Sequence, residues 1–276
     1  MTDNRPIGVF DSGIGGLTVL REIWKAVPEE STIYFGDNSR FPYGTKSRST
    51  IIRYSLQNMK FLESKDVKMI VIACNTASAY AFEELKVKAG VPVVEVVTPG
   101  ADVACRATKN GRIGIIATKG TISTGVYKKA VEKRAEELGM KDIEIFQQAC
   151  PLFVSLAEEG WWDNEIARMT AGEYLEPLKA EGIDTLVLGC THYPLLAKVI
   201  GEVMGPDVKL INTGVAVAGT VKDILEKNHL GSDETDPVRK FYTSDDPAMF
   251  EQVASPFLGQ GLPSGTLHVT TDRYEV

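Results

Sequence analysis

Short apolar runs alternate with longer segments of helical periodicity along this chain, and that alternation restricts the fold more than any other feature. The apolar runs are rich in Val and Ile and are apolar throughout, as in strands that helices cover on both faces. We expect strands at residues 7–10, 32–35, 69–73, 91–97, 112–117, 142–146, 185–189 and 208–212. The pattern predicts an α/β protein with doubly wound, mainly parallel sheets.

A weak internal repeat predicts two units of this kind. The segment IGVFDSG (7–13) resembles IGIIATKG (113–120) if one residue is inserted. Each copy is an apolar run that breaks into a glycine-containing turn before a helix. We therefore expect two pseudo-symmetric domains, with the active site in the cleft between them.

The domain boundaries follow from where the chain changes unit. We expect the first domain to comprise residues 1–98 and 212–276, because the chain is predicted to cross back near Asn212. The second domain is then residues 99–211. The boundary falls at Thr98-Pro99-Gly100, a sequence typical of a turn and not of a flexible linker.

Composition excludes several classes of function. The 276 residues are 43% hydrophobic and carry a net charge of −7, from 37 acidic and 30 basic side chains. This balance argues against a nucleic-acid-binding face, which would be basic. No apolar run reaches the roughly 18 residues of a membrane span, and the start of the chain lacks a signal-peptide pattern, so we expect a cytoplasmic protein.

The four cysteines are far apart and never form a CxxC pair. Neither a disulfide framework nor a metal site fits this spacing, and free thiols are expected in a reducing compartment. A single free cysteine is usually a small buried apolar residue, which is our interpretation of Cys105 and Cys150.

Cys74 and Cys190 differ from the other two because each follows an apolar run, in IVIACNTAS (70–78) and LVLGCTHYP (186–194). They follow the start of the two repeats at similar distances, 67 and 77 residues. Ligands of doubly wound sheets bind at the carboxyl ends of strands, where both cysteines are expected. The start of a following helix would lower a thiol pKa toward neutrality. Two unrelated buried cysteines remain the alternative.

Two thiols on opposite sides of one ligand suit an enzyme that inverts a carbon centre. One thiol removes a proton from one face, and the other returns a proton to the opposite face. His192 could orient or relay protons to Cys190, and Asp11 could act similarly beside Cys74. Neutral donors suited to binding carboxylates lie nearby, namely Ser12, Asn75, Thr76 and Thr191.

Three further polar segments are expected at strand ends. The loop DSGIGG (11–16) lacks the dinucleotide and P-loop patterns, and its first residue is acidic, which disfavours phosphate. Its glycines are expected to allow close approach to a small ligand or a tight turn. Thr118-Lys119-Gly120 and FGDNSRFPYG (35–44) are the other two segments. Glu158 is one of two adjacent acids on a short helix, where a solvated and a functional interpretation compete evenly.

Taken together, the segments FDSGIGGLTVLREI, YFGDNSRFPYG, VIACNTASA, ACPLFVSLAEEGW and LGCTHYPLL resemble the glutamate racemase family. These enzymes are cofactor-independent amino-acid racemases of bacterial cell-wall synthesis. The resemblance runs in order from about residue 6 to residue 215 and becomes vague beyond. It implies two pseudo-symmetric α/β units with the active site between them.

By motif position, the resemblance implies that Cys74 and Cys190 are the two acid/base thiols. It implies Asp11 and His192 as their supporting partners, and Glu158 as the acid on the Cys190 side, chosen over its neighbour only from its spacing after PLFV. The substrate-binding residues that it implies are Asp11, Ser12, Tyr43, Gly44, Asn75, Thr76, Thr191 and His192.

The resemblance implies interconversion of L- and D-glutamate without a cofactor or metal, supplying D-glutamate for peptidoglycan. The expected partner is this small molecule, not a nucleic acid or a membrane, and a homodimer is left open. The first predicted strand starts at about residue 7, so we expect no N-terminal extension and no obligate activator. Two alternatives stay open: a racemase of another small acid such as aspartate, and a binding or regulatory protein with silent cysteines.

Overall fold

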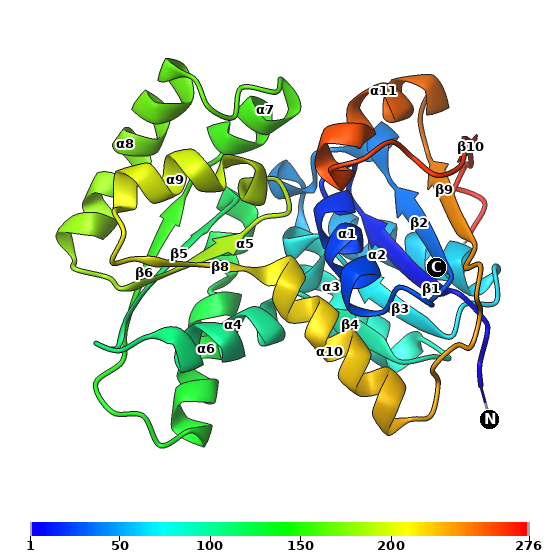
Figure 1. The fold of residues 1–276 in the computed structure, drawn as a ribbon, viewed down its shortest axis with the longest axis horizontal. Coiled ribbons are helices and arrows are strands. Elements are labelled where there is room, and N and C mark those ends of the chain that lie inside the picture. Colours follow the sequence, from blue (N-terminus) through cyan, green and yellow to red (C-terminus); the bar gives the residue numbers. More distant parts are fainter. Residues whose placement is uncertain (1, 275–276) are drawn as a thin grey trace.

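A computed structural model describes residues 2–274, which form two parallel β-sheets flanked by helices (Figure 1). The six-stranded sheet has the order β10-β9-β2-β1-β3-β4 and the four-stranded sheet the order β6-β5-β7-β8. Every strand pair described is parallel, which confirms the predicted class. The strands are β1 (Ile7–Asp11), β2 (Thr32–Gly36), β3 (Met69–Ile72), β4 (Val93–Glu95), β5 (Arg112–Ala117), β6 (Glu144–Ala149), β7 (Thr185–Gly189), β8 (Lys209–Asn212), β9 (Arg239–Thr243) and β10 (Thr266–His268).

The two sheets share one winding pattern. In each, the first strand lies inside, the second strand pairs on one side, and the third and fourth lie on the other: β2-β1-β3-β4 and β6-β5-β7-β8. The strands of the internal repeat, β1 and β5, are therefore equivalent. So are β3 and β7, which precede Cys74 and Cys190. In each sheet the direction in which strands are added reverses after the second strand. The carboxyl ends of β1 and β3 therefore border one crevice, and those of β5 and β7 border a neighbouring one.

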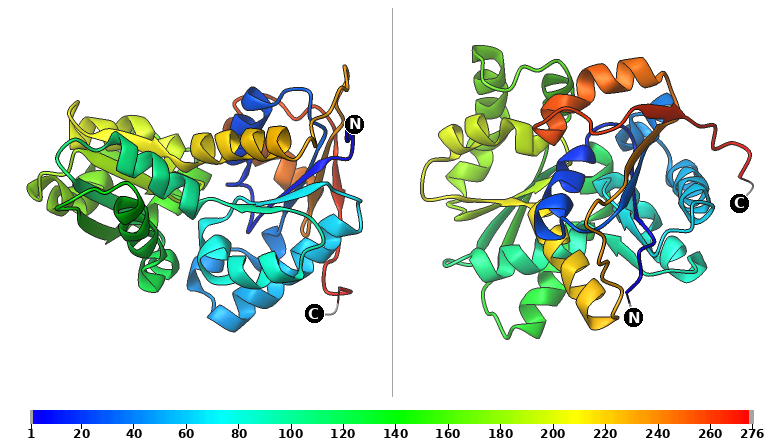
Figure 2. Two further views of the ribbon diagram at one scale, coloured as in Figure 1. Left: turned by 90° about the horizontal axis from the view of Figure 1, so that it is seen from below. Right: turned by 45° about the vertical axis from the view of Figure 1, so that its right-hand side comes forward.

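Helices cover both faces of both sheets (Figures 1 and 2). One core cluster extends through both sheets and includes Val9 of β1 and Ile115 of β5, whereas two smaller clusters lie on the outer faces. The two sheets thus pack as one body around shared apolar side chains. The helices are α1 (Leu17–Ala26), α2 (Arg48–Glu63), α3 (Asn75–Lys88), α4 (Val97–Ala107), α5 (Lys119–Thr124), α6 (Val126–Glu137), α7 (Leu152–Glu158), α8 (Glu165–Ala180), α9 (Ala197–Met204), α10 (Thr213–Lys227) and α11 (Pro247–Leu258), with short 3-10 turns η1 (Asn38–Arg40), η2 (Tyr43–Thr45) and η3 (Tyr193–Leu196).

The predicted turn at Thr98-Pro99-Gly100 is wrong, because these residues form the first turn of α4. A proline is tolerated there, since the first amides of a helix have no partner within the helix. The Glu95 carboxylate accepts hydrogen bonds from the backbone N–H groups of Val97 and Thr98 and so starts the helix. The apolar run at 91–97 therefore ends as a strand at Glu95.

The C-terminal segment adds two strands that the sequence analysis missed. In β9, Arg239 and Lys240 precede the apolar residues, so the run is too short and too polar to stand out. Its pairing with β2 places Arg239 beside Thr32 and Thr243 beside Gly36. Figure 2 shows this segment beside the N-terminal strands. The domain boundaries themselves stay a prediction.

Candidate active site

A pocket of about 280 Å³ lies where residues from both sheets meet. Its walls come from the loops that follow β1, β2, β3, β5, β6 and β7. Of the predicted site residues, only Asp11 does not line it. The predicted residues that do line it are Ser12, Tyr43, Gly44, Cys74, Asn75, Thr76, Glu158, Cys190, Thr191 and His192.

Cys74 begins α3 as its N-cap, and the backbone N–H of Ala77 donates a hydrogen bond to its sulfur at 3.4 Å. The thiol lies 3.5 Å from Oγ of Ser12. Burial and, to a smaller extent, the charge of Asp11 raise the pKa of Cys74 to about 12, although hydrogen bonds from the Ala77 amide and from Ser12 oppose the rise. The prediction that the helix start would bring this pKa toward neutrality is therefore wrong, because loss of solvation outweighs the hydrogen bonds that the sulfur makes.

Asp11 ends β1 beneath the pocket and has no solvent exposure. One carboxylate oxygen accepts the N–H of Gly13 at 3.0 Å, and the other has no hydrogen-bond partner among the described residues. Burial raises the pKa of Asp11, whereas the positive charge of His192 lowers it. Asp11 thus influences the Cys74 thiol through its charge and does not line the pocket itself.

Cys190 faces a histidine and an acid. The Sγ atom lies 3.8 Å from Nδ1 of His192, and Nε2 of His192 lies 3.1 Å from Oε1 of Glu158. Burial alone would lower the pKa of His192, but the contacts with Cys190 and Glu158 raise it to about 10. The ring is therefore an imidazolium at neutral pH. Glu159 is exposed, so Glu158 is the acid that the structure places on His192.

The DSGIGG loop packs against the second cysteine segment. A Cβ atom on Gly15 would lie 2.3 Å from Oγ1 of Thr191 and 2.5 Å from Cε1 of His192. The Thr18 hydroxyl donates to the Thr191 carbonyl at 2.8 Å. Gly15 is therefore needed for close approach between the two halves of the site, and its neighbour is another part of the protein, not a phosphate.

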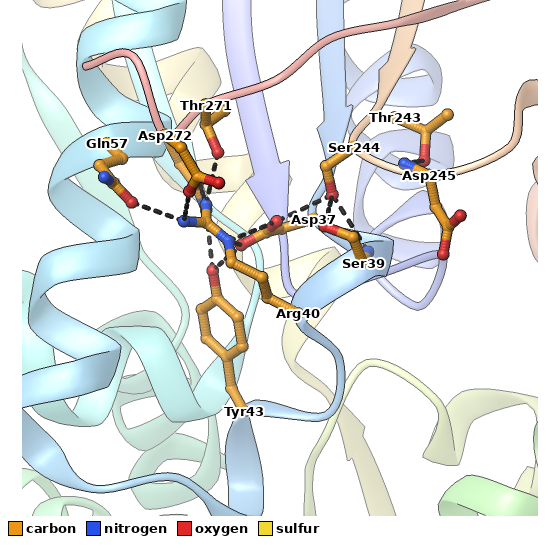
Figure 3. A network of polar contacts seen from close by, with 11 residues as sticks. Asp37, Ser39, Arg40, Tyr43, Gln57, Thr243, Ser244, Asp245, Thr271 and Asp272 are labelled. Carbon is orange, nitrogen blue, oxygen red and sulfur yellow. Dashed lines mark hydrogen bonds and ion pairs between the residues drawn. The ribbon is translucent and has the colours of Figure 1, made fainter.

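The loop that carries Tyr43 and Gly44 is held by a buried polar network around Arg40 (Figure 3). Nε of Arg40 lies 2.8 Å from Oδ2 of Asp37, and the Tyr43 hydroxyl donates to the same carboxylate. The guanidinium also donates to Gln57 at 2.5 Å and to Thr271 at 2.7 Å. Residues from η1, α2 and the C-terminal segment thus fix this wall of the pocket.

Several lining residues were not among the predicted site residues, although the segments 35–44 and 118–120 had been expected at strand ends. Thr118 and Lys119 follow β5 at the point equivalent to the loop after β1, and the Thr118 hydroxyl lies 3.1 Å from that of Thr76. The residues around α7 belong to the quoted segment ACPLFVSLAEEGW, but only Glu158 was predicted there, because the fold decides which face of that helix lies over the pocket. The missed residues are Phe41, Pro42, Thr45, Thr118, Lys119, Pro151, Val154 and Ser155.

All four cysteines are free, as the sequence predicted, and all four are buried. Cys105 lies in α4 and Cys150 follows β6, and neither lines the pocket. Among residues 2–274, no group of three or more His, Cys, Asp or Glu side chains could hold a metal ion. No helix in the same part of the chain is both long and apolar enough to cross a membrane.

Comparisons with known proteins agree with the motif resemblance. The family model described as Asp/Glu/Hydantoin racemase matches residues 7–221. A glutamate racemase from Geobacter metallireducens is 51% identical over 256 residues, which are 92% of this chain and 93% of that protein.

Solved structures are similar over almost the whole chain. A glutamate racemase isoform from Bacillus anthracis has a TM-score of 0.92 at 36% identity, covering 97% of this chain and 98% of its own. A Francisella tularensis glutamate racemase in complex with D-glutamate has a TM-score of 0.90 at 39% identity, covering 99% and 100%. The resemblance is confirmed, and the chain belongs to the Asp/Glu/hydantoin racemase family.

Proposed function

We propose that this chain interconverts L- and D-glutamate by moving protons between the substrate Cα and two thiols, Cys74 and Cys190, without a cofactor. The observation that carries the proposal is that both cysteines, from equivalent strand ends, line a single pocket. The similarity to glutamate racemases, one of them solved with D-glutamate, supports glutamate as the substrate.

The environments of the two thiols support opposite starting roles. His192, with its pKa raised to about 10, places a positive charge 3.8 Å from the Cys190 sulfur, whereas Cys74, with its pKa of about 12, keeps its proton. Cys190 as thiolate takes the Cα proton, and the electron pair left on Cα spreads into the α-carboxylate. Cys74 then gives its proton to the opposite face. The enzyme is left with a Cys190 thiol and a Cys74 thiolate, which is the starting state for the other enantiomer.

The carbanion-like state needs donors to the α-carboxylate in a water-poor site. Asn75, Thr76 and Thr191 line the pocket and are at most 5% exposed, so they supply neutral donors where water is largely excluded. Tyr43 and Gly44 also line the pocket. Lys119 contributes a positive charge toward an anionic substrate.

The proposed product gives the enzyme its role in the cell. D-glutamate would be supplied for peptidoglycan synthesis, as the family membership implies. We infer that the chain works in the cytoplasm, where its four thiols stay reduced. A homodimer stays a prediction, which sedimentation of the purified protein would test.

Proton exchange in deuterated water tests the proposal. The purified protein is incubated with D-glutamate in deuterated water without added cofactor, and the Cα proton is followed by NMR. We expect loss of the Cα–H signal together with formation of L-glutamate. D-aspartate is the matched control substrate, and exchange of aspartate alone would reassign the substrate. Absence of exchange with both, combined with no protection of the thiols by glutamate, would contradict an enzymatic function.

A further inference from the structure

We propose that Tyr127 is a positioning residue that holds the Asn75 amide with its NH₂ group toward the carboxylate of the ligand. Tyr127 lies in α6, beside the four-stranded sheet, whereas Asn75 begins α3 directly after Cys74. The inference rests on the proposed function, because it needs an anionic ligand in the pocket.

A short hydrogen bond joins the two side chains. The distance from Oη of Tyr127 to Oδ1 of Asn75 is 2.5 Å, and the two residues are 1% and 3% exposed. The Tyr127 hydroxyl donates its proton to this Asn75 oxygen, and the nearby Thr213 hydroxyl donates to the Leu188 carbonyl at 3.5 Å. Burial raises the pKa of Tyr127 well above its ordinary value, and the hydroxyl therefore remains a donor.

This bond decides which end of the amide is free. With Oδ1 of Asn75 occupied by Tyr127, Nδ2 is buried and has no hydrogen-bond partner among residues 2–274. Buried donors in folded proteins are nearly always paired, and Asn75 lines the pocket, so a ligand acceptor is the missing partner. If the amide turned over, its oxygen would face the carboxylate and repel it. By donating to Oδ1, the Tyr127 hydroxyl favours the orientation that leaves Nδ2 for the ligand.

The ring of Tyr127 packs against the segment that delivers the other thiol. A Cβ atom on Gly189, the residue before Cys190, would lie 3.0 Å from Cε2 of Tyr127. A Cβ atom on Gly100 would lie 3.5 Å from Cε1. One side chain therefore contacts the strand end of Cys190 through its ring and the residue after Cys74 through its hydroxyl. Tyr127 therefore fixes the position of the Asn75 amide relative to the strand end that carries Cys190.

Tyr127→Phe tests the inference because it keeps the ring and removes the hydroxyl. We expect KM to rise about tenfold for both enantiomers with a smaller change in kcat, since one ligand donor is no longer oriented. Asn75→Ala removes the amide itself. In that background Tyr127→Phe is expected to have no further effect on KM, because the hydroxyl acts only through Asn75.

Tyr80→Phe is the matched control. The Tyr80 hydroxyl also joins the two halves, donating to the Gly120 carbonyl at 3.2 Å, but it does not touch Asn75. We expect its KM to equal that of the wild type. An unchanged KM in Tyr127→Phe, additive losses with Asn75→Ala, or the same rise in Tyr80→Phe would each overturn the inference.

Binding measurements separate this inference from the proposed function. If the wild type binds D-glutamate but does not racemise it, the proposed function fails. The Kd values of the same variants then test the Tyr127 role directly, with the same tenfold weakening expected. If the wild type does not bind D-glutamate at all, both the proposed function and the positioning role are wrong.

Discussion

The two cysteines of the pocket, Cys74 and Cys190, occupy equivalent places in the fold but have different chemical surroundings. Cys74 follows β3 and has a hydroxyl, Ser12, and a buried carboxylate, Asp11, beside it. Cys190 follows β7 and faces His192, which in turn contacts Glu158. The strands repeat, whereas the loops that supply the neighbours do not.

This difference shows that two thiols at equivalent backbone positions need not have the same affinity for a proton. A buried thiol beside a carboxylate keeps its proton, and a thiol beside an imidazolium is stabilised as the anion. A reaction between mirror-image substrates needs both states at the outset, one on each side of the carbon. In the proposed mechanism, the different surroundings of Cys74 and Cys190 supply these two states, and each turnover exchanges them.

The largest expected effect is loss of either thiol. Cys74→Ala and Cys190→Ala should each lower the rate of racemisation of both enantiomers by about a thousandfold or more, because one proton donor or acceptor is absent in either direction. Polarimetry from each pure enantiomer measures this. Cys150→Ala, at a buried cysteine outside the pocket, is the control and should stay active. Substantial activity in either pocket variant would rule out a two-thiol mechanism.

A smaller effect is expected from the acid behind His192. Glu158→Gln removes a charge that helps keep the imidazolium, so we expect a loss of about a hundredfold or less, with an altered pH profile. Glu159→Gln changes the same chemical group one residue later on an exposed position and should leave the rates unchanged. Equal racemisation rates for Glu158→Gln and Glu159→Gln would show that Glu158 does not support His192 in the reaction.

The smallest expected effect is on stability. The pKa of His192 is raised in the folded state from 6.5 to about 10, so the folded protein binds the proton more tightly than the unfolded chain. The stabilisation is fully present below about pH 6.5 and is lost as pH rises toward 10. The free energy of unfolding should therefore decrease over this range more steeply in the wild type than in His192→Asn.

His268→Asn is the control for that measurement, because His268 is exposed on β10. Its slope of unfolding free energy against pH should match the wild type. If His192→Asn also matched the wild type, the charge contrast between the surroundings of the two cysteines would have no thermodynamic basis.

Much of the fold could be predicted because buried parallel strands have an unmistakable local pattern. Every strand from β1 to β8 coincides with a predicted apolar run, with shifts at the ends. The strand at residues 239–243 was not predicted because it depends on pairing with β2, which no local sequence pattern reveals. The prediction of a turn at Thr98 to Gly100 failed because the Glu95 carboxylate binds the first amides of α4, and a proline is tolerated in the first turn of a helix.

The candidate site divides in the same way. The sequence by itself determined which residues end the equivalent strands, because apolar periodicity and the repeat bring Cys74 and Cys190 to the sheet edge. Only the tertiary structure decided their chemistry. Burial raises the pKa of Cys74, and α7, from elsewhere in the chain, brings Glu158 to His192. Solvation and charge depend on what surrounds an atom in space, which the order of residues along one strand does not specify.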